Sequence, residues 1–384
     1  MSLTQNQARV LWDAGGFAVL LGVARGAEAG LDGTMHVVGA FAGYKFVPPG
    51  LHALVWGAGE GSSEGAAAAL PLRSALIKHW GSRERVVLTL PEGGGEVESM
   101  TLEEAGLRAL DPRLASYPFA GLDEWKRLTA CISREVADVL PGVVDSFTPV
   151  EGEQDEVEAA LRDVGREGEG GAEGHRKTIR LPVFDLKRSW RAGAPAEDVT
   201  RWSRDKSDLW ARVCGAHGGP RALLGHTALA YILFAQVWNA PALGAYRRLV
   251  ALQCRAHAAL AEPELFADAF GSGDMAGNAQ DARETALAFV ELLVAQIGSL
   301  PEHAAVEVPD LEEFFEGEIE ALRRGLGAAL AVRGWWGLAK RAQAAWSQLR
   351  AVAAKRGWSI DTLPQGDEEE DEEEGEYAPV VVET

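Results

Sequence analysis

The chain has 384 residues, of which 47% are hydrophobic and 24% charged, and its formal net charge is −20. This composition excludes collagen-like, disulfide-scaffold and wholly disordered proteins, and the length predicts two domains or more. Residues 367–376 carry nine acids and no base, and residues 151–174 carry nine acids against two arginines. The rest of the chain is nearly neutral. A broad nucleic-acid-binding surface is therefore not expected, because binding a phosphate backbone needs clustered Lys and Arg.

The first part of the chain predicts a β-rich domain. The apolar runs that predict strands are Phe17–Val23, Leu51–Trp56 and Arg85–Leu90. Gly- and Pro-rich turns separate them, which favours an antiparallel sandwich or barrel. Apolar residues at three- and four-residue steps predict one helix over Leu122–Leu140, which the pair Pro141-Gly142 ends.

The second part predicts an all-helical domain, either a bundle or a solenoid. The expected helices are Ala196–Val213, Arg221–Asn239, Ala242–Leu260, Ala282–Leu300, Leu311–Val332 and Trp335–Arg356. Residues 222–246 carry no charge, but they include polar residues and Pro241, so we expect a buried helix and no membrane span. Thr178–Phe184 has a strand-like pattern.

The resulting fold class is a multidomain α+β protein. The predicted units are a β-rich N-terminal domain (1–150), a flexible acidic Gly/Glu-rich linker (151–175), a helical domain (176–360), an acidic linker (361–376) and a β-strand tail (377–384). The acidic linkers contain too few aromatic and β-branched residues to bury a core. Three well-separated cysteines without a CxxC motif indicate reduced, intracellular thiols.

Motifs for catalysis are weak. Gly61–Gly65 fits the G-x-S-x-G pattern around Ser63, but the surrounding chain lacks the alternating strands and helices that a nucleophile elbow needs. The histidines show no metal-ligand spacing. His226 and His257 are expected in the core, and His52, which follows Pro48-Pro49-Gly50, is expected to anchor a turn. We predict no enzyme, and no catalytic, cofactor-binding or metal-binding residue.

Residues 321–360 contain eight Lys and Arg and no acid. This segment could present a basic face to RNA or to an acidic partner. It could equally be a bundle helix with a solvated basic face, which is the favoured interpretation. The adjacent acid run could also neutralise it within the same chain.

The C-terminal tail is the predicted partner-binding site. Its residues are Tyr377, Ala378, Pro379, Val380, Val381, Val382 and Glu383. A short valine-rich strand cannot stabilise itself, so it is expected to add to the edge of a sheet, either its own or a partner's. Pro379 lacks an N–H and restricts the strand to an edge position. The thirteen residues 364–376 could reach about 45 Å, which suits a tethered peptide.

Several segments, in order, resemble the A1-cistron splicing factor family. They are Gly26–Asp32, Gly43–His52, Tyr117–Phe119 with Trp125, Pro195–Val213, Leu223–Leu260 and the terminal Ala378–Glu383. The chain departs from the family pattern at Ala40-Phe41, where Pro-Lys is usual, and at Ala53, where an aromatic residue is usual. Any role of that loop is therefore left open.

The resemblance implies a non-enzymatic assembly chaperone of the U5 snRNP, in the cytoplasm and the nucleus. Its expected partner is the large central scaffold protein of the particle, at the RNase-H-like and Jab1/MPN-like domains, where it would block premature binding of RNA and helicase during maturation of the pre-mRNA splicing machinery. No direct nucleic-acid, membrane or small-molecule partner and no cofactor is expected. The alternatives are an acidic chaperone for basic proteins such as histones and a serine hydrolase that uses Ser63.

Overall fold

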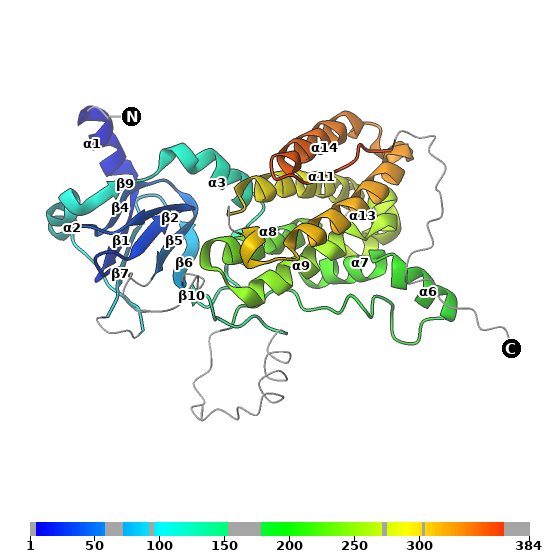
Figure 1. Cartoon of the computed structure of the whole chain (residues 1–384), viewed down its shortest axis with the longest axis horizontal. Helices are drawn as coiled ribbons and strands as arrows, with labels where there is room; N and C mark the ends of the chain where they lie inside the picture. Colours follow the sequence, from blue (N-terminus) through cyan, green and yellow to red (C-terminus); the bar gives the residue numbers. More distant parts are fainter. Residues whose placement is uncertain are drawn as a thin grey trace, which may run out of the picture.

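The structure is a computed structural model that describes residues 5–57, 72–91, 96–152, 178–270, 275–301 and 304–364. Two β-sheets lie at one end of the molecule and a set of packed helices lies at the other (Figure 1). The predicted fold class, a β-rich N-terminal part followed by a helical C-terminal part, is confirmed. Ser63 lies outside the described residues, as do most of the 151–175 linker and the whole 377–384 tail.

The first sheet has the strand order β8-β7-β1-β4-β9. Its strands are β1 (Gly16–Leu21), β4 (Gly43–Val47), β7 (Arg85–Thr89), β8 (Glu98–Ser99) and β9 (Leu114–Ser116). The pairs β1–β7 and β4–β9 are parallel, whereas β1–β4 and β7–β8 are antiparallel. The expectation of a purely antiparallel arrangement is therefore wrong for this sheet. Parallel pairing needs a long crossover, and here the chain passes through the second sheet before it returns as β7.

The second sheet is antiparallel and has the order β10-β6-β5-β2-β3. Its strands are β2 (Glu28–Leu31), β3 (Thr34–Val37), β5 (Gly50–Gly57), β6 (Arg73–Trp80) and β10 (Val143–Asp145). Asp32 and Gly33 join β2 to β3 with φ angles of 53° and 83°. Positive φ at both central residues is the requirement of a type I′ hairpin, which an Asp-Gly pair meets.

Apolar side chains fill the space between the two sheets, as in a sandwich. One cluster joins Ala18 and Leu20 of β1 to Leu54 and Trp56 of β5. The opposite face of the first sheet packs on Leu107 of helix α2 (Glu104–Leu110). Helix α1 (Gln5–Ala14) contacts β4.

The helix predicted over Leu122–Leu140 is two helices, α3 (Leu122–Thr129) and α4 (Arg134–Ala137). The prediction of one continuous helix is wrong because Ser133 starts a new one: its hydroxyl accepts a hydrogen bond from the backbone N–H of Val136, at 3.3 Å. Short 3₁₀ turns lie at Asp111–Arg113 and Phe119–Gly121. In the predicted strand Thr178–Phe184, Ile179 forms a single bridge with Val150.

The helical part contains α6 (Ala196–Arg204), α7 (Ser207–Ala216), α8 (Pro220–Val237), α9 (Ala240–Cys254), α10 (His257–Ala261), α11 (Met275–Ser299), α12 (Ala304–Glu307), α13 (Leu311–Ala331) and α14 (Ala339–Ala354), with 3₁₀ turns at Pro263–Phe270 and Arg333–Trp335. Two predicted helices are therefore each broken in two. Asp205 interrupts the first, since its carboxylate accepts from the N–H of Ser207 at 2.8 Å, and the second breaks at Arg255-Ala256.

The hydrophobic core is continuous from the second sheet into the helices. Leu51, Val55 and Ile77 of β5 and β6 belong to the same buried cluster as Leu229 and Phe234 of α8. Figure 1 shows α8 between the sheets and the helical part, where α9 and α11 pack against it. Within the described residues, no helix is long and apolar enough to cross a membrane.

Candidate partner-binding surface

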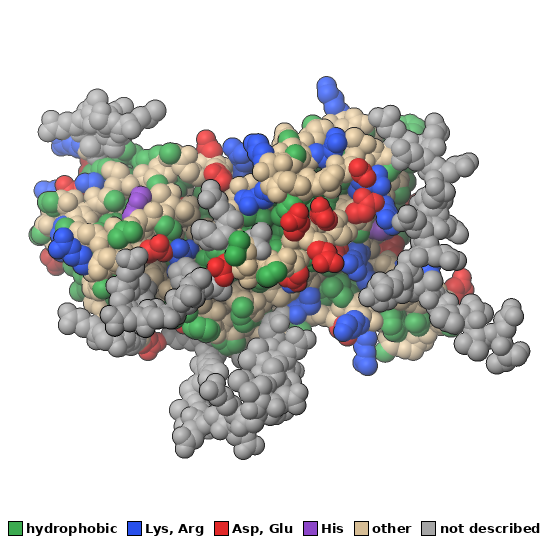
Figure 2. Space-filling model, in the orientation of Figure 1, with side chains coloured by type: hydrophobic (Ala, Val, Ile, Leu, Met, Phe, Trp, Pro, Cys, Tyr) green, Lys and Arg blue, Asp and Glu red, His purple; other side chains and the backbone are tan. Residues whose placement is uncertain are grey.

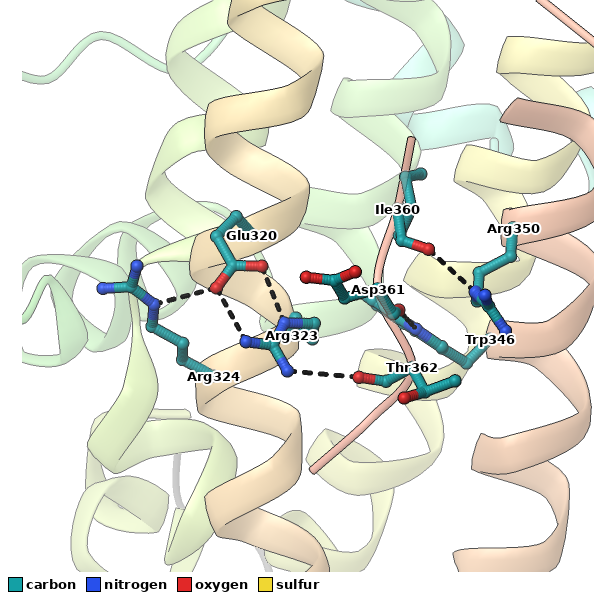
Figure 3. A network of polar contacts seen from close by, with 8 residues as sticks. All are labelled: Glu320, Arg323, Arg324, Trp346, Arg350, Ile360, Asp361 and Thr362. Atoms are coloured by element: carbon teal, nitrogen blue, oxygen red, sulfur yellow. Dashed lines mark hydrogen bonds and ion pairs between the residues drawn. The ribbon is translucent and has the colours of Figure 1, made fainter. Parts of the chain in front are cut away.

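The chain that leads to the tail is fixed between two helices (Figure 3). Three side chains each bind one of three successive backbone carbonyls. Arg350 donates through Nε to Ile360 O at 2.8 Å, Trp346 through Nε1 to Asp361 O at 2.8 Å, and Arg323 through Nη1 to Thr362 O at 3.1 Å. The side chains come from both α13 and α14, so residues 360–362 are held as an extended segment across the pair.

Apolar contacts reinforce this attachment. Trp358 is buried and stacks on Phe315 of α13, with the ring centroids 5.3 Å apart. Leu363 is also buried. Pro364 packs against Gly327, where a Cβ atom would lie 2.7 Å from the proline ring. The packed chain therefore extends to Pro364, four residues into the segment 361–376 that the sequence assigned to a linker.

Glu320 orients the arginine in this network. Its carboxylate accepts from Arg323 Nε at 2.7 Å and from Arg323 Nη2 at 3.0 Å, and it also accepts from Arg324 Nε at 3.0 Å. The hydrogen bond from Arg323 is the main reason why the pKa of Glu320 is lowered. The ionised carboxylate thus leaves one guanidinium nitrogen of Arg323 directed at the carbonyl of Thr362.

The predicted contact residues, Tyr377–Glu383, lie outside the described residues, so the structure places none of them. The structure does show where the packed chain that precedes these residues ends, at Pro364. No sequence pattern predicts the attachment at 360–364, because it depends on contacts between residues 10 to 39 positions apart.

Polar contacts tie the two parts of the chain together. Asn239, between α8 and α9, donates through Nδ2 to Asp145 O at 2.8 Å and to Thr148 O at 2.9 Å. Ser146 donates through Oγ to Val237 O at 2.7 Å. These three contacts add to the shared core, so the two parts of the chain are packed as one body.

Close backbone approach strengthens the same junction. Trp125 of α3 donates through Nε1 to Leu51 O at 2.6 Å. Gly225 of α8 lies where a Cβ atom would be 2.5 Å from the carbonyl oxygen of Cys131. A glycine at this position allows the α3–α4 turn to rest on the helix backbone.

A buried polar cluster links the segments Gly26–Asp32 and Gly43–His52. The Asp32 carboxylate accepts from Ala53 N at 2.9 Å and from the Tyr117 hydroxyl at 2.6 Å, and it contacts His52 Nδ1 at 2.6 Å. His52 Nε2 donates to Pro48 O at 2.8 Å. The predicted turn-anchoring role of His52 is confirmed. Since all of these side chains are buried, the cluster is structural.

Several basic side chains of the segment 321–360 pair with carboxylates or bind backbone carbonyls of the helical part. Arg341 pairs with Glu284 at 2.6 Å and with Glu291 at 3.0 Å. Arg356 donates through Nε to Ile297 O at 2.6 Å. On the face drawn in Figure 2, acidic and basic side chains of the helical part are interspersed. These contacts favour the interpretation as bundle helices over an RNA-binding face.

No group of His, Cys, Asp and Glu among the described residues could hold a metal ion. Burial raises the pKa of the Cys214 and Cys254 thiols. His226 lies in the core as expected, and burial lowers its pKa to about 4. His257 is partly buried. Cys214, Cys254 and His226 are therefore packed core residues, whereas the expected core position of His257 is not confirmed.

Comparison with protein families matches both parts of the chain. Residues 14–142 match the AAR2 N-terminal domain, and residues 181–361 match the AAR2 C-terminal repeat region. The chain belongs to the AAR2 family. The resemblance to the A1-cistron splicing factors is thereby confirmed, and membership of the AAR2 family supports a role as an assembly factor of the U5 snRNP in splicing.

Curated AAR2 homologues cover most of the chain. The protein AAR2 homolog of Mus musculus is 25% identical over 356 residues, which span 83% of this chain and 85% of the relative. The homolog of Macaca fascicularis is 27% identical over 296 residues, or 68% and 74% of the two chains. That of Homo sapiens is 28% identical over 289 residues, or 66% and 72%.

Proposed function

We propose that the chain is a non-enzymatic assembly chaperone that binds the RNase-H-like and Jab1/MPN-like domains of the central U5 scaffold protein. Its tail, Tyr377–Glu383, adds a strand to a sheet edge of this partner. The body of the protein then covers surfaces that RNA and the particle's helicase use later. Assembly in the cytoplasm followed by release in the nucleus fits this sequence of events.

The attachment of residues 360–364 carries this proposal. A tethered peptide gains affinity when its starting point is fixed relative to a second binding surface, because the second contact then forms within the complex. Here the tether starts from a segment held by three hydrogen bonds to backbone carbonyls. The tether must also start from a rigid body that offers the second binding surface. The continuous core supports such a body, to which a two-domain partner can bind.

The alternation of side chains along a strand sets the specificity expected of the tail. In an added strand, Val380 and Val382 face one side, and Val381 faces the other. Main-chain hydrogen bonds supply affinity, and pockets for alternate side chains select the sequence. Pro379 has no N–H to donate to a ladder hydrogen bond and fits the start of the strand.

Removal of residues 377–384 tests the proposal. We expect the affinity for a fragment carrying both partner domains, measured by calorimetry, to fall at least tenfold, about 1.4 kcal/mol or more. The free energy of unfolding should stay within about 1 kcal/mol. Equal affinities of the two proteins would refute strand addition by the tail.

A matched variant separates this function from that of an acidic chaperone for basic proteins. Residues 367–376 are replaced by an uncharged linker of equal length, and the last eight residues are kept. We expect this variant to bind the scaffold fragment with affinity close to that of the natural chain. Loss of binding here, with retained binding by the tail-less protein, would assign the activity to the acid run.

A further inference from the structure

A groove of about 510 Å³ lies between α13 and α14, and Thr362 and Leu363 of the attached segment form part of its wall. Leu330 and Ala331 line it on the α13 side, and Ala339 and Gln343 line it on the α14 side. Pro364, the last described residue, also lines the groove. Its volume is within the range of sites that hold ligands, about 300–1,000 Å³.

The attached segment points into this groove. Its carbonyls contact Arg350 first and Trp346 next, so the chain runs along α14 toward the beginning of that helix. On the α13 side it passes from Arg323 to Gly327, toward the end of that helix. Figure 3 shows the segment running between the two helices in this way. The next residues of the chain therefore start at the mouth of the groove.

Two exposed cations lie close in sequence to the lining residues at the α13–α14 turn. Arg333 and Lys340 lie at the turn between α13 and α14, next to the lining residues Ala331 and Ala339. Both side chains are exposed, and no ion pair joins either of them to another described residue. The sequence between Glu320 and Asp361 contains no acid that could neutralise them.

We propose that Gln365 and Gly366 occupy the groove and that the first carboxylates of the acid run, Asp367–Glu370, pair with Arg333 and Lys340. The lengths agree. From Gly327 to Ala331 the helix rises about 6 Å, at 1.5 Å per residue. Two extended residues span about 7 Å. Asp367 is thus the first residue to reach the turn between α13 and α14. The negative charge of the acid run therefore begins beside Arg333 and Lys340.

This contact shortens the free tether. Six residues, Asp371–Glu376, remain between the bound carboxylates and the tail, and they reach about 20 Å. The contact also sets the direction in which the tail leaves the body. The inference is independent of the partner, since it concerns two segments of the same chain.

The amine reactivity of two lysines tests the proposal on the full chain. Lys340 flanks the groove, and Lys355 is an exposed lysine at the other end of α14. Both are acetylated with an amine-reactive ester at low salt and quantified by mass spectrometry. Ion pairing protects an amine, so Lys340 should react about threefold more slowly than Lys355. At 1 M salt, where the Debye length is about 3 Å, the two rates should converge.

Two variants with equal loss of charge identify the carboxylates. The first is Asp367→Asn, Glu368→Gln, Glu369→Gln and Glu370→Gln. The second is Asp371→Asn, Glu372→Gln, Glu373→Gln and Glu374→Gln. The first should abolish the protection of Lys340, and the second should leave most of it.

Three results would overturn the proposal. Equal rates for Lys340 and Lys355 in the natural chain would show that the acid run does not dock. Equal effects of the two variants would show a diffuse field of charge in place of a defined contact. Protection that disappears on dilution would assign the carboxylates to a second copy of the chain.

Discussion

The indole nitrogen of Trp346 donates to the backbone carbonyl of Asp361 at 2.8 Å, across 15 positions of sequence. This bond joins the middle of α14 to the segment that leads into the tail. Trp346 is buried, and loss of its indole N–H leaves this partly buried carbonyl without its side-chain partner.

Trp346→Phe should therefore loosen the segment at 360–364. Phenylalanine keeps an aromatic ring in the core but cannot donate the hydrogen bond. We expect a loss of about 1–2 kcal/mol in the free energy of unfolding, measured with urea. Amide hydrogen exchange at 360–364 should become faster. Trp336, whose side chain is 66% exposed, offers the matched control: Trp336→Phe should change stability by less than about 0.5 kcal/mol.

Asp32→Asn should destabilise the N-terminal part. Asparagine has nearly the same shape and tolerates the positive φ of 53°, so the backbone turn is kept. The amide group, however, cannot accept from Ala53, Tyr117 and His52 together. We expect a cost of about 2–4 kcal/mol by chemical denaturation. The exposed Asp123→Asn should be close to neutral, and an equal effect of both changes would contradict the structural role of the cluster.

His226 makes the stability depend on pH. Burial lowers its pKa from 6.5 to about 4, so the folded protein holds it neutral where the unfolded chain is already protonated. Its contribution is complete above pH 6.5 and is lost as the pH falls toward 4. We expect natural protein to lose about 2–3 kcal/mol between pH 7 and 4.5 relative to His226→Leu.

Urea unfolding at several pH values measures this difference. His226 Nδ1 has no hydrogen-bond partner among the described residues, so leucine removes the titration without breaking a bond at that atom. The nearby His217 ring, 5.8 Å away, also has a pKa lowered by burial and remains in both proteins. Parallel pH curves for the two proteins would rule out His226 as the source.

Asn239 should be among the most sensitive residues of the junction. In addition to its two donated bonds, its Oδ1 accepts from Ala242 N at 2.7 Å and caps α9. Asn239→Ala removes the cap and both donors, with an expected cost of about 2–4 kcal/mol. Asn239→Ser retains an oxygen for the cap and should cost less. Thermal or urea unfolding distinguishes the two, and the reverse order would contradict the assigned contacts.

The sequence predicted the elements whose patterns are local. The apolar runs Phe17–Val23, Leu51–Trp56 and Arg85–Leu90 overlap β1, β5 and β7, and the predicted helix Arg221–Asn239 overlaps α8. Strand β6 was missed because its apolar run, Ala75–Ile77, is only three residues long and its half-buried residues include Arg73, Lys78 and His79. Strands β2 and β3 were missed because they are four residues long and adjoin the Asp32-Gly33 turn.

The apolar periodicity of the sequence predicts neither the helix breaks nor the attachment of residues 360–364. The apolar spacing continues across Asp205 and across Ser133, although each side chain starts a new helix by accepting a backbone hydrogen bond. Capping signals were present in the sequence and could have located these breaks. The contacts of Arg323 and Arg350 with the segment 360–362 had no such signal, since they require the packed positions of α13 and α14.

The buried surface shared by the second sheet and α8 has a consequence for how the polypeptide can be cut. The connection at 153–177 joins two halves that already adhere through Leu51, Ile77 and Phe234 and through the bridge between Val150 and Ile179. Cleavage within it would therefore leave a nicked but assembled protein. The two halves, produced as separate polypeptides, should associate and refold together. Either half alone would expose a large hydrophobic surface and aggregate.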